Sequence, residues 1–149
     1  MEYAGFWRRA TAMTLDSVLL GIIQTVVNIV IIAMIGAASV AGGETDDAAT
    51  VGMVGVIGLL TFVAMWLYFS LMESSAKQAT LGKMLVGIVV TDTDGNRISF
   101  GKASGRYFGK IVSSIILMIG YLMAAFTERK QALHDIMAGC LVIRKPTST

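Results

Sequence analysis

Two long apolar segments, residues 17–41 and 51–72, constrain the fold of this chain more than any other feature. As α-helices rising about 1.5 Å per residue, they would be about 37 and 33 Å long, enough to cross the hydrocarbon core of a bilayer. Only the nine residues GGETDDAAT separate them, so consecutive helices must run antiparallel. The sequence therefore predicts two spanning helices, at about residues 10–41 and 51–73, joined as a hairpin.

The composition agrees with a membrane protein. Hydrophobic residues make up 55% of the 149 residues, charged residues only 15%, and the mean hydropathy is +0.72. A soluble domain of this size needs more polar surface than that. The lipid bilayer is therefore the expected partner, and we expect no nucleic-acid partner.

The charges that flank the two segments predict their orientation. Arg8 and Arg9 precede the first segment, and Lys77 and Lys83 follow the second, whereas the intervening loop carries carboxylates and no base. Lysine and arginine collect on the cytoplasmic side of membrane proteins. We therefore expect a multi-pass protein of the cell (inner or plasma) membrane with a cytoplasmic N-terminus and the acidic loop outside.

A short β-structure is expected on the cytoplasmic side. MLVGIVVT is β-branched and Asp94-Gly95 is a strong hairpin signal, which predicts a hairpin at about 84–100 with strands at 85–91 and 97–100. A two-stranded hairpin is only marginally stable in water, and CLVIRK, at 140–145, has the pattern of a third strand.

The length of the apolar segment 111–126 leaves two membrane topologies open. It belongs to a third helical segment at about 102–126, and its sixteen residues lie at the lower limit of a spanning length. The segment either crosses the membrane or enters and turns back near Gly120. A C-terminal helix and strand at about 131–145 that pairs with the hairpin would favour the re-entrant alternative. The predicted fold is a single all-α membrane domain over 1–149, with two or three apolar helices and a small cytoplasmic sheet.

Polar side chains form a stripe on the first apolar helix. Arg9 and Asp16 lie seven residues apart, within about 20° of each other on the helix surface, and Gln24 and Asn28 continue the same sector. A polar stripe inside lipid must face protein or water. Arg9 lies about 10 Å from Asp16 along the helix axis, so its long side chain could reach back to the carboxylate. Asp135, in a second charged cluster, could meet either residue from another helix.

The rare reactive residue types exclude most catalytic sites. The chain has one cysteine and one histidine, Cys140 and His134, so it can form neither an internal disulfide nor a histidine-based metal cluster. ATLGKM lacks the first glycine and the final hydroxyl of a phosphate loop, and Asp92-x-Asp94-Gly95 lacks the spacing of a calcium loop. We expect no enzyme activity, no cofactor and no metal.

Taken together, these motifs resemble the RDD family of small bacterial membrane proteins, named for one arginine and two aspartates. The resemblance rests on Arg9-x-x-Ala12-x-x-x-Asp16, then QATLGKMLVGIVV, DG and RISFGKASGRYFGK, and finally QALHDIMAG with Asp135. It covers nearly the whole chain and implies that Arg9, Asp16 and Asp135 are the name-giving residues. It also implies a role in transport, since some relatives are described as sodium/proton antiporters, or in membrane complexes.

Two hypotheses follow from this reading. In the first, a homo-oligomer exchanges Na⁺ for H⁺, because two or three helices cannot enclose a path alone. In the second, the chain is a non-catalytic structural or assembly subunit of a membrane complex. Its buried charges then hold the helices to the cytoplasmic hairpin. The proposed ion pathway or charge network comprises Arg9, Asp16, Gln24, Asn28 and Asp135, and the proposed oligomer contact comprises Gly52, Gly55 and Gly58.

Overall fold

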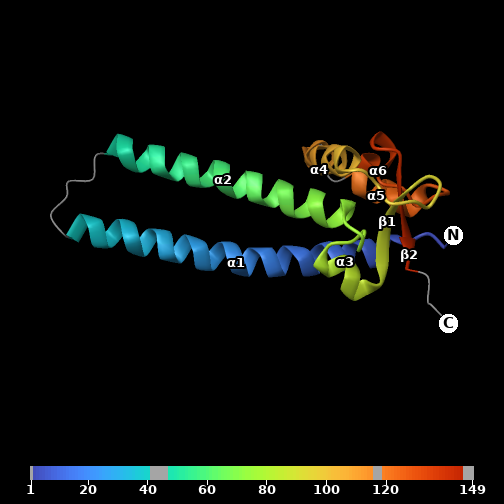
Figure 1. The fold of residues 1–149 in the computed structure, drawn as a ribbon, viewed down its shortest axis with the longest axis horizontal. Coiled ribbons are helices and arrows are strands. Elements are labelled where there is room, and N and C mark those ends of the chain that lie inside the picture. Colours follow the sequence, from blue (N-terminus) through green and yellow to red (C-terminus); the bar gives the residue numbers. More distant parts are fainter. Residues whose placement is uncertain (1, 41–46, 116–118, 146–149) are drawn as a thin grey trace. The chain divides into compact units, whose positions relative to one another are not determined.

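A computed structural model of the protein describes residues 2–40, 47–115 and 119–145. The chain divides into two compact units: unit 1 holds Met1–Asp16 and Trp66–Thr149, and unit 2 holds Ser17–Met65. In chain order the elements are α1 (Phe6–Val40), α2 (Asp47–Ser74), α3 (Leu81–Val86), β1 (Ile88–Asp92), α4 (Phe100–Ile115), α5 (Ile119–Phe126), α6 (Leu133–Met137) and β2 (Cys140–Arg144) (Figure 1).

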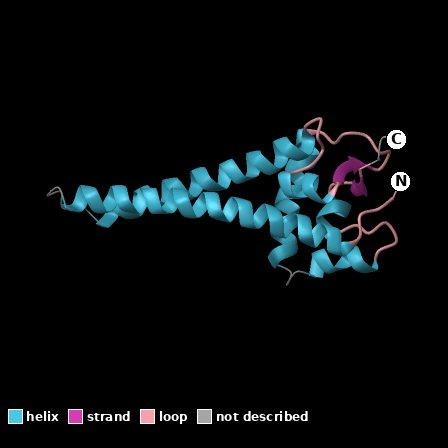
Figure 2. Ribbon diagram, turned by 90° about the horizontal axis from the view of Figure 1, so that it is seen from below, coloured by secondary structure: helices cyan, strands magenta, loops and turns pink. Residues whose placement is uncertain are grey.

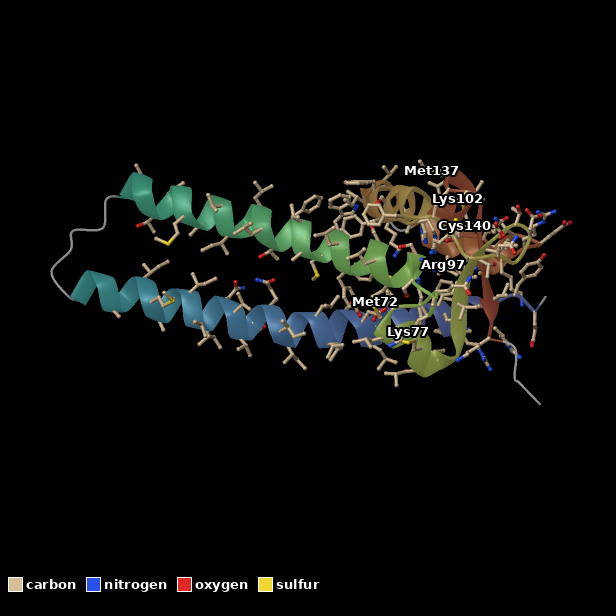
Figure 3. The ribbon with its side chains drawn as sticks, viewed as in Figure 1. Met72, Lys77, Arg97, Lys102, Met137 and Cys140 are labelled. Carbon is tan, nitrogen blue, oxygen red and sulfur yellow. The ribbon has the colours of Figure 1, made fainter. Side chains whose placement is uncertain are left out.

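Unit 2 consists of the apolar parts of α1 and α2. Phe6–Ala37 and Thr50–Ser74 are long and apolar enough to cross a membrane, and within the described residues the most apolar stretch of each is uncovered by protein. The 17–37 part of α1 would be about 31 Å long, which matches a hydrocarbon core of about 30 Å. Carbon predominates among its side chains (Figure 3). The two predicted apolar helices are thus present, and each could span a membrane.

The sheet in unit 1 joins strands that are distant in sequence. β1 pairs with β2 in antiparallel register, with Val90 opposite Val142 (Figure 2). The strand predicted at 97–100 does not form, and this part of the prediction is wrong. Arg97 makes one isolated bridge to Thr91. After Arg97, the Ser99 side chain accepts a hydrogen bond from the Lys102 N–H. This bond caps the N-terminus of α4, which begins at Phe100.

The free edge of β2 is covered by residues 2–4. The Ala4 N–H donates to the Val142 carbonyl at 2.9 Å, and the Arg144 N–H donates to the Glu2 carbonyl at 2.8 Å. Residues 2–4, β1 and β2 must therefore lie on the same side of the membrane. It follows that the chain between the two strands starts and ends on one side.

This topology bears on the apolar segment 111–126. The segment is shared between the end of α4 and all of α5, and residues 116–118 lie outside the described part of the chain. Gly120, near which the re-entrant alternative would turn back, lies inside α5. A single crossing by this segment would place β1 and β2 on opposite sides, which their pairing forbids.

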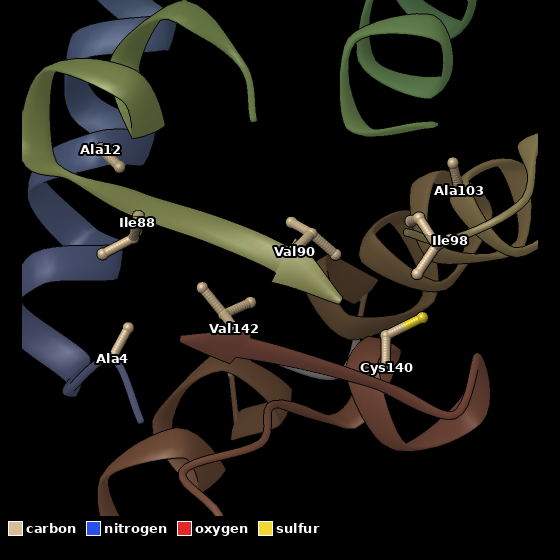
Figure 4. Packing of buried hydrophobic residues seen from close by; sticks show 8 residues of the cluster. All are labelled: Ala4, Ala12, Ile88, Val90, Ile98, Ala103, Cys140 and Val142. Carbon is tan, nitrogen blue, oxygen red and sulfur yellow. The ribbon is translucent and has the colours of Figure 1, made fainter. Parts of the chain in front are cut away.

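A small apolar core packs around the sheet. It contains Ala4, Ala12, Ile88, Val90, Ile98, Ala103, Cys140 and Val142 (Figure 4). Cys140 is fully buried there as a small apolar side chain. The first turns of α1 are therefore part of unit 1, and helix α3 packs against them through Gly82.

Gly82 allows a contact that no other residue type would permit. A Cβ atom built at Gly82 would lie 2.3 Å from the Ala12 carbonyl oxygen and 2.9 Å from the Asp16 nitrogen, both of which are backbone atoms. Backbone cannot rotate away as a side-chain end can, so a methyl group here would force α3 away from α1.

We predict that Gly82→Ala lowers the free energy of unfolding by about 1–3 kcal/mol, the usual cost of overpacking. Chemical denaturation in detergent micelles measures this. Gly105→Ala is the matched control, because nothing lies within 4 Å of its Cβ position and it sits inside α4. Equal stability of the two variants would contradict the close packing of α3 on α1.

Candidate functional site

A buried arginine lies at the centre of unit 1. Arg106, on α4, is only 1% exposed and lies between two carboxylates. Its Nη1 donates to Glu73 Oε2 at 2.6 Å, while its Nε and Nη2 donate to Asp135 Oδ1 at 3.0 and 2.5 Å. The guanidinium thus joins the end of α2 to the start of α6.

Asp135 is the most heavily bonded carboxylate of the site. It is fully buried as the third residue of α6. Besides Arg106, its Oδ2 accepts hydrogen bonds from Arg9 Nη1 and, at 3.2 Å, from the Ala132 N–H. Burial opposes its charge, but the cations of Arg106 and Arg9 outweigh this and hold the pKa of Asp135 well below its ordinary value. Asp135 is therefore ionised at neutral pH.

Glu73 binds two lysines on the other side of Arg106. It is 1% exposed, and its Oε1 accepts hydrogen bonds from Lys83 at 2.5 Å and from Lys110 at 3.2 Å. Lys110 also lies over the Phe69 ring, 4.8 Å from the centroid. Glu73, Asp135, Arg9, Arg106, Lys83 and Lys110 form one connected set, called the charge network below.

The charge network holds more cations than anions. Four basic side chains surround two carboxylates. Burial lowers the pKa of Lys83 to about 7; Glu73 opposes this, while Lys110 and Arg106 add to it. The pKa of Arg106 is raised, because Glu73 and Asp135 outweigh the cost of burial. The network therefore resists any further positive charge.

Asp16 has a different role from Arg9. It is buried, and its two oxygens accept hydrogen bonds from the Thr80 hydroxyl at 2.5 Å and from the Gly82 N–H at 2.7 Å. Both donors lie at the N-terminus of α3, where free N–H groups favour a negative charge. Within the described residues, Asp16 makes no ion pair with Arg9, whose side chain turns to Asp135 and to the Ala4 carbonyl.

Gln24 and Asn28 lie outside this site, in unit 2. Gln24 Nε2 donates to Asn28 Oδ1 at 3.1 Å, and Asn28 is exposed. They follow Asp16 on α1 by about 12 and 18 Å along the axis. Of the five predicted site residues, the structure thus brings Arg9 and Asp135 together and leaves Asp16, Gln24 and Asn28 with other partners.

Glu73 and Arg106 were missed by the sequence analysis. A signal for Glu73 did exist, since it is the only carboxylate between residues 48 and 91 and ends an apolar segment. An isolated carboxylate at the edge of a span needs a buried cation. The cation, however, lies 33 residues further along the chain, and several bases near it are equally plausible in sequence.

His134 lies beside the network as a neutral imidazole. It is 5% exposed, and its Nε2 lies 3.4 Å from Asp135 Oδ1. Burial lowers the pKa of His134 to about 3; Asp135 opposes this, whereas Arg106, Lys110 and Lys83 add to it. Among the described residues, no group of three histidine, cysteine or acidic side chains is arranged to hold a metal ion.

We predict that replacing the central arginine is costly. Arg106→Met leaves Glu73 and Asp135 buried with fewer partners, and the loss of one member of a buried ion pair costs about 3–5 kcal/mol. Chemical denaturation in detergent micelles measures the change in unfolding free energy. Lys102→Met, an exposed position on the same helix, should change it little. Equal losses in the two variants would argue against a central role for Arg106.

We also predict that mild acidification destabilises the protein through the buried His134. The folded pKa of His134, about 3, lies below the ordinary value of 6.5, so the unfolded chain binds more protons between these pH values. Stability therefore falls as pH drops below about 6.5, by at most about 1.4 kcal/mol per pH unit for one proton.

Thermal unfolding between pH 7 and 5 tests this. His134 is the only histidine, so His134→Gln should flatten the decline in this range. An unchanged slope in His134→Gln would show that another group causes it. Below about pH 4 both proteins should lose stability, because the depressed pKa of Asp135 then contributes.

Comparisons with known proteins agree with the resemblance seen in the sequence. Residues 3–139 match the RDD family. The chain is 38% identical to the uncharacterized protein YxaI of Bacillus subtilis (strain 168), over 95% of this chain and 97% of that protein. It is 29% identical to the uncharacterized membrane protein YteJ of the same organism, over 96% of this chain and 82% of that protein. No solved structure matches the chain. The chain belongs to the RDD family of membrane proteins.

Proposed function

We propose that this RDD protein is a non-catalytic structural or assembly subunit of a membrane complex. Two spans anchor it, and unit 1 is presented at the membrane surface as a rigid, charged platform. One observation carries the proposal: all six oxygens of Asp16, Glu73 and Asp135 already accept hydrogen bonds from the chain itself. Carboxylates bound in this way act as a lock between helices.

The same observation argues against a cation site within unit 1. A sodium ion needs several oxygen ligands, and each carboxylate oxygen here would have to release an N–H or O–H donor first. The charge network also holds an excess of basic groups: the pKa of Lys83 is lowered mainly by burial, and the charges of Lys110 and Arg106 lower it further. A further cation would be repelled before it reached Asp135.

The distribution of charge supports a cytoplasmic location for unit 1 in the cell membrane. All twelve lysine and arginine residues of the chain fall within unit 1, whereas residues 42–50, between the two spans, carry three carboxylates and no base. This asymmetry follows the positive-inside rule. The multi-pass topology then places the acidic loop outside.

A homo-oligomer is supported by polar groups on the spanning part of α1. Gln24 and Asn28 bond to each other, but each amide keeps further donors and acceptors, and the Asn28 side chain is exposed. Amides on a lipid-facing helix favour association with another helix. The smooth surface at Gly52, Gly55 and Gly58, where no atom lies within 4 Å of the Cβ positions, offers a second contact.

The same amides favour a second candidate function, cation/proton exchange by the homo-oligomer. In this alternative, Gln24 and Asn28 of several chains would line a path through the membrane. Asp16 would exchange H⁺ for Na⁺, with Asp135 as partner and Arg9 tuning the carboxylates. It would require Asp16 to release the N-terminus of α3 in each cycle.

The two functions make opposite predictions for Asp16→Asn, and flux and stability measured together in liposomes separate them. For the structural subunit, the wild-type protein moves neither Na⁺ nor H⁺ under a gradient. Asp16→Asn should then lower the unfolding free energy by about 1–3 kcal/mol, because the amide offers one acceptor oxygen where two buried donors each had one. Asp94→Asn, at an exposed turn, is the matched control and should leave stability unchanged.

The structural function would be overturned in favour of transport by one combined result. The wild-type protein would show flux, and Asp16→Asn would abolish that flux while preserving the unfolding midpoint. Flux through the wild-type protein that survives in Asp16→Asn would overturn both functions as stated, since neither then explains the role of Asp16.

A further inference from the structure

A cavity lies beside the sheet, outside the charge network. Its volume is about 440 Å³, within the range of about 300–1,000 Å³ that is usual for small-ligand pockets. It is lined by residues 76–79 between α2 and α3, by Met84 of α3, by residues 87–89 at the start of β1, and by Lys145 after β2. None of these residues belongs to the charge network, so the site described above does not account for this cavity.

Main-chain hydrogen bonds fix the walls of the cavity. On one side, the Val90 N–H donates to the Gln78 carbonyl at 2.7 Å, and Gln78 Nε2 donates to the Val90 carbonyl at 3.2 Å. The Gln78 N–H donates to the Ser75 carbonyl at 3.0 Å, in a turn with a Gln78 φ of 51° that is uncommon outside glycine. On the other side, the Lys145 N–H donates to the Gly87 carbonyl at 2.9 Å. The cavity is therefore preformed, which lowers the cost of binding a ligand.

Two lysines give the cavity its charge. Lys77 (labelled in Figure 3) and Lys145 line it, and both are exposed. Among the described residues neither lysine makes an ion pair, whereas the two lysines of the charge network both bind Glu73. The described residues that line the cavity include no carboxylate. A phosphate monoester carries about 1.5 to 2 negative charges at pH 7, so two ammonium groups match its charge.

The rest of the lining suits the organic part of such an ester. Ala79 and Val89 belong to an apolar cluster with Leu141 and Ile143, and Met84 packs against that cluster. Methionine is flexible enough to fit ligands of irregular shape. Ligand pockets commonly combine an apolar lining with a few polar groups that fix the orientation of the ligand. The lining and the charge thus favour an anion that carries an uncharged organic part.

The position of the cavity in the chain makes it accessible from two sources. Thr50–Ser74 is long and apolar enough to cross a membrane, and Ala76 lies only two residues beyond it. An extended chain covers at most about 3.6 Å per residue, so the Lys77 Cα lies within about 11 Å of the Ser74 Cα. A phosphate at the membrane surface and a phosphate in the adjacent water are both within reach of such a site.

We propose that this cavity binds a phosphate ester, with the phosphate held by Lys77 and Lys145 and the organic part against Ala79, Met84 and Val89. The ester is the headgroup of an anionic phospholipid or a dissolved molecule with the same phosphate group. The cavity shares no residue with the charge network or with the amides of the spanning helix, so the proposal holds for either candidate function.

A binding experiment with two arms tests the proposal and separates the two sources. In the first arm, the full-length protein in phosphatidylcholine nanodiscs is titrated calorimetrically with glycerol 3-phosphate. In the second arm, the nanodiscs also contain phosphatidic acid, whose headgroup is a phosphate monoester, and native mass spectrometry counts the molecules that each chain retains. The test variant carries Lys77→Gln and Lys145→Gln. The matched control carries Lys102→Gln and Lys130→Gln, which remove the same charge from exposed positions outside the cavity.

The expected result is one bound ester per wild-type chain in at least one arm. The cavity variant should weaken binding about tenfold or more, because hydrogen bonds to charged groups contribute at least that much affinity. The control variant should bind as the wild type does, and equal unfolding midpoints would show that all three proteins are folded. Binding in the first arm identifies a dissolved ester as a ligand, and binding in the second arm alone identifies a lipid headgroup.

Three results would overturn the proposal. The first is no binding in either arm. The second is binding that the cavity variant retains at wild-type strength. The third is equal weakening in the cavity and control variants, which would show a general effect of positive charge and no site at the cavity.

Discussion

The bridge that Arg106 makes between Glu73 and Asp135 is the interaction on which the rest of unit 1 depends. Its three N–H groups bind two carboxylates from different helices, a geometry that the planar guanidinium provides and a lysine does not. Because isolated charges are not tolerated away from water, each carboxylate fixes its own helix relative to α4. Arg9 extends the connection to α1 and Lys83 extends it to α3, so five helices meet at one set of ion pairs.

Asp16 acts as a second, smaller connection of the same kind. It binds the N-terminus of α3, and Gly82 lets that helix approach α1 closely enough for the hydrogen bonds to form. Since α3 leads directly into β1, the position of Asp16 also sets the position of the sheet. Asp16 and Asp135 thus have separate partners, although both stabilise contacts with the first turns of α1.

Local features of the chain could be predicted from the sequence, whereas long-range partners could not. The two spans follow from length and hydropathy, and the strand character of 140–144 follows from its β-branched residues. Helix periodicity also placed Arg9 and Asp16 on one side of α1. It could not show that Asp16 would accept hydrogen bonds from α3, or that Arg9 would pair with a carboxylate of α6. The strand predicted at 97–100 does not form for a similar reason. The Ser99 side chain accepts a hydrogen bond from the Lys102 N–H, which favours a helix start over pairing with a neighbouring strand.

The pairing of residues 2–4 with β2 sets the order in which the molecule is completed. Ala4 and Val142 are bonded although almost the whole chain lies between them. Contacts so distant in sequence form late, because their loop must close first. During synthesis, both apolar helices can enter the bilayer before the partners of residues 2–4, Arg9 and Glu73 have been translated. Residues 2–4 and Arg9 therefore acquire these partners only after β2 and Asp135 have been translated.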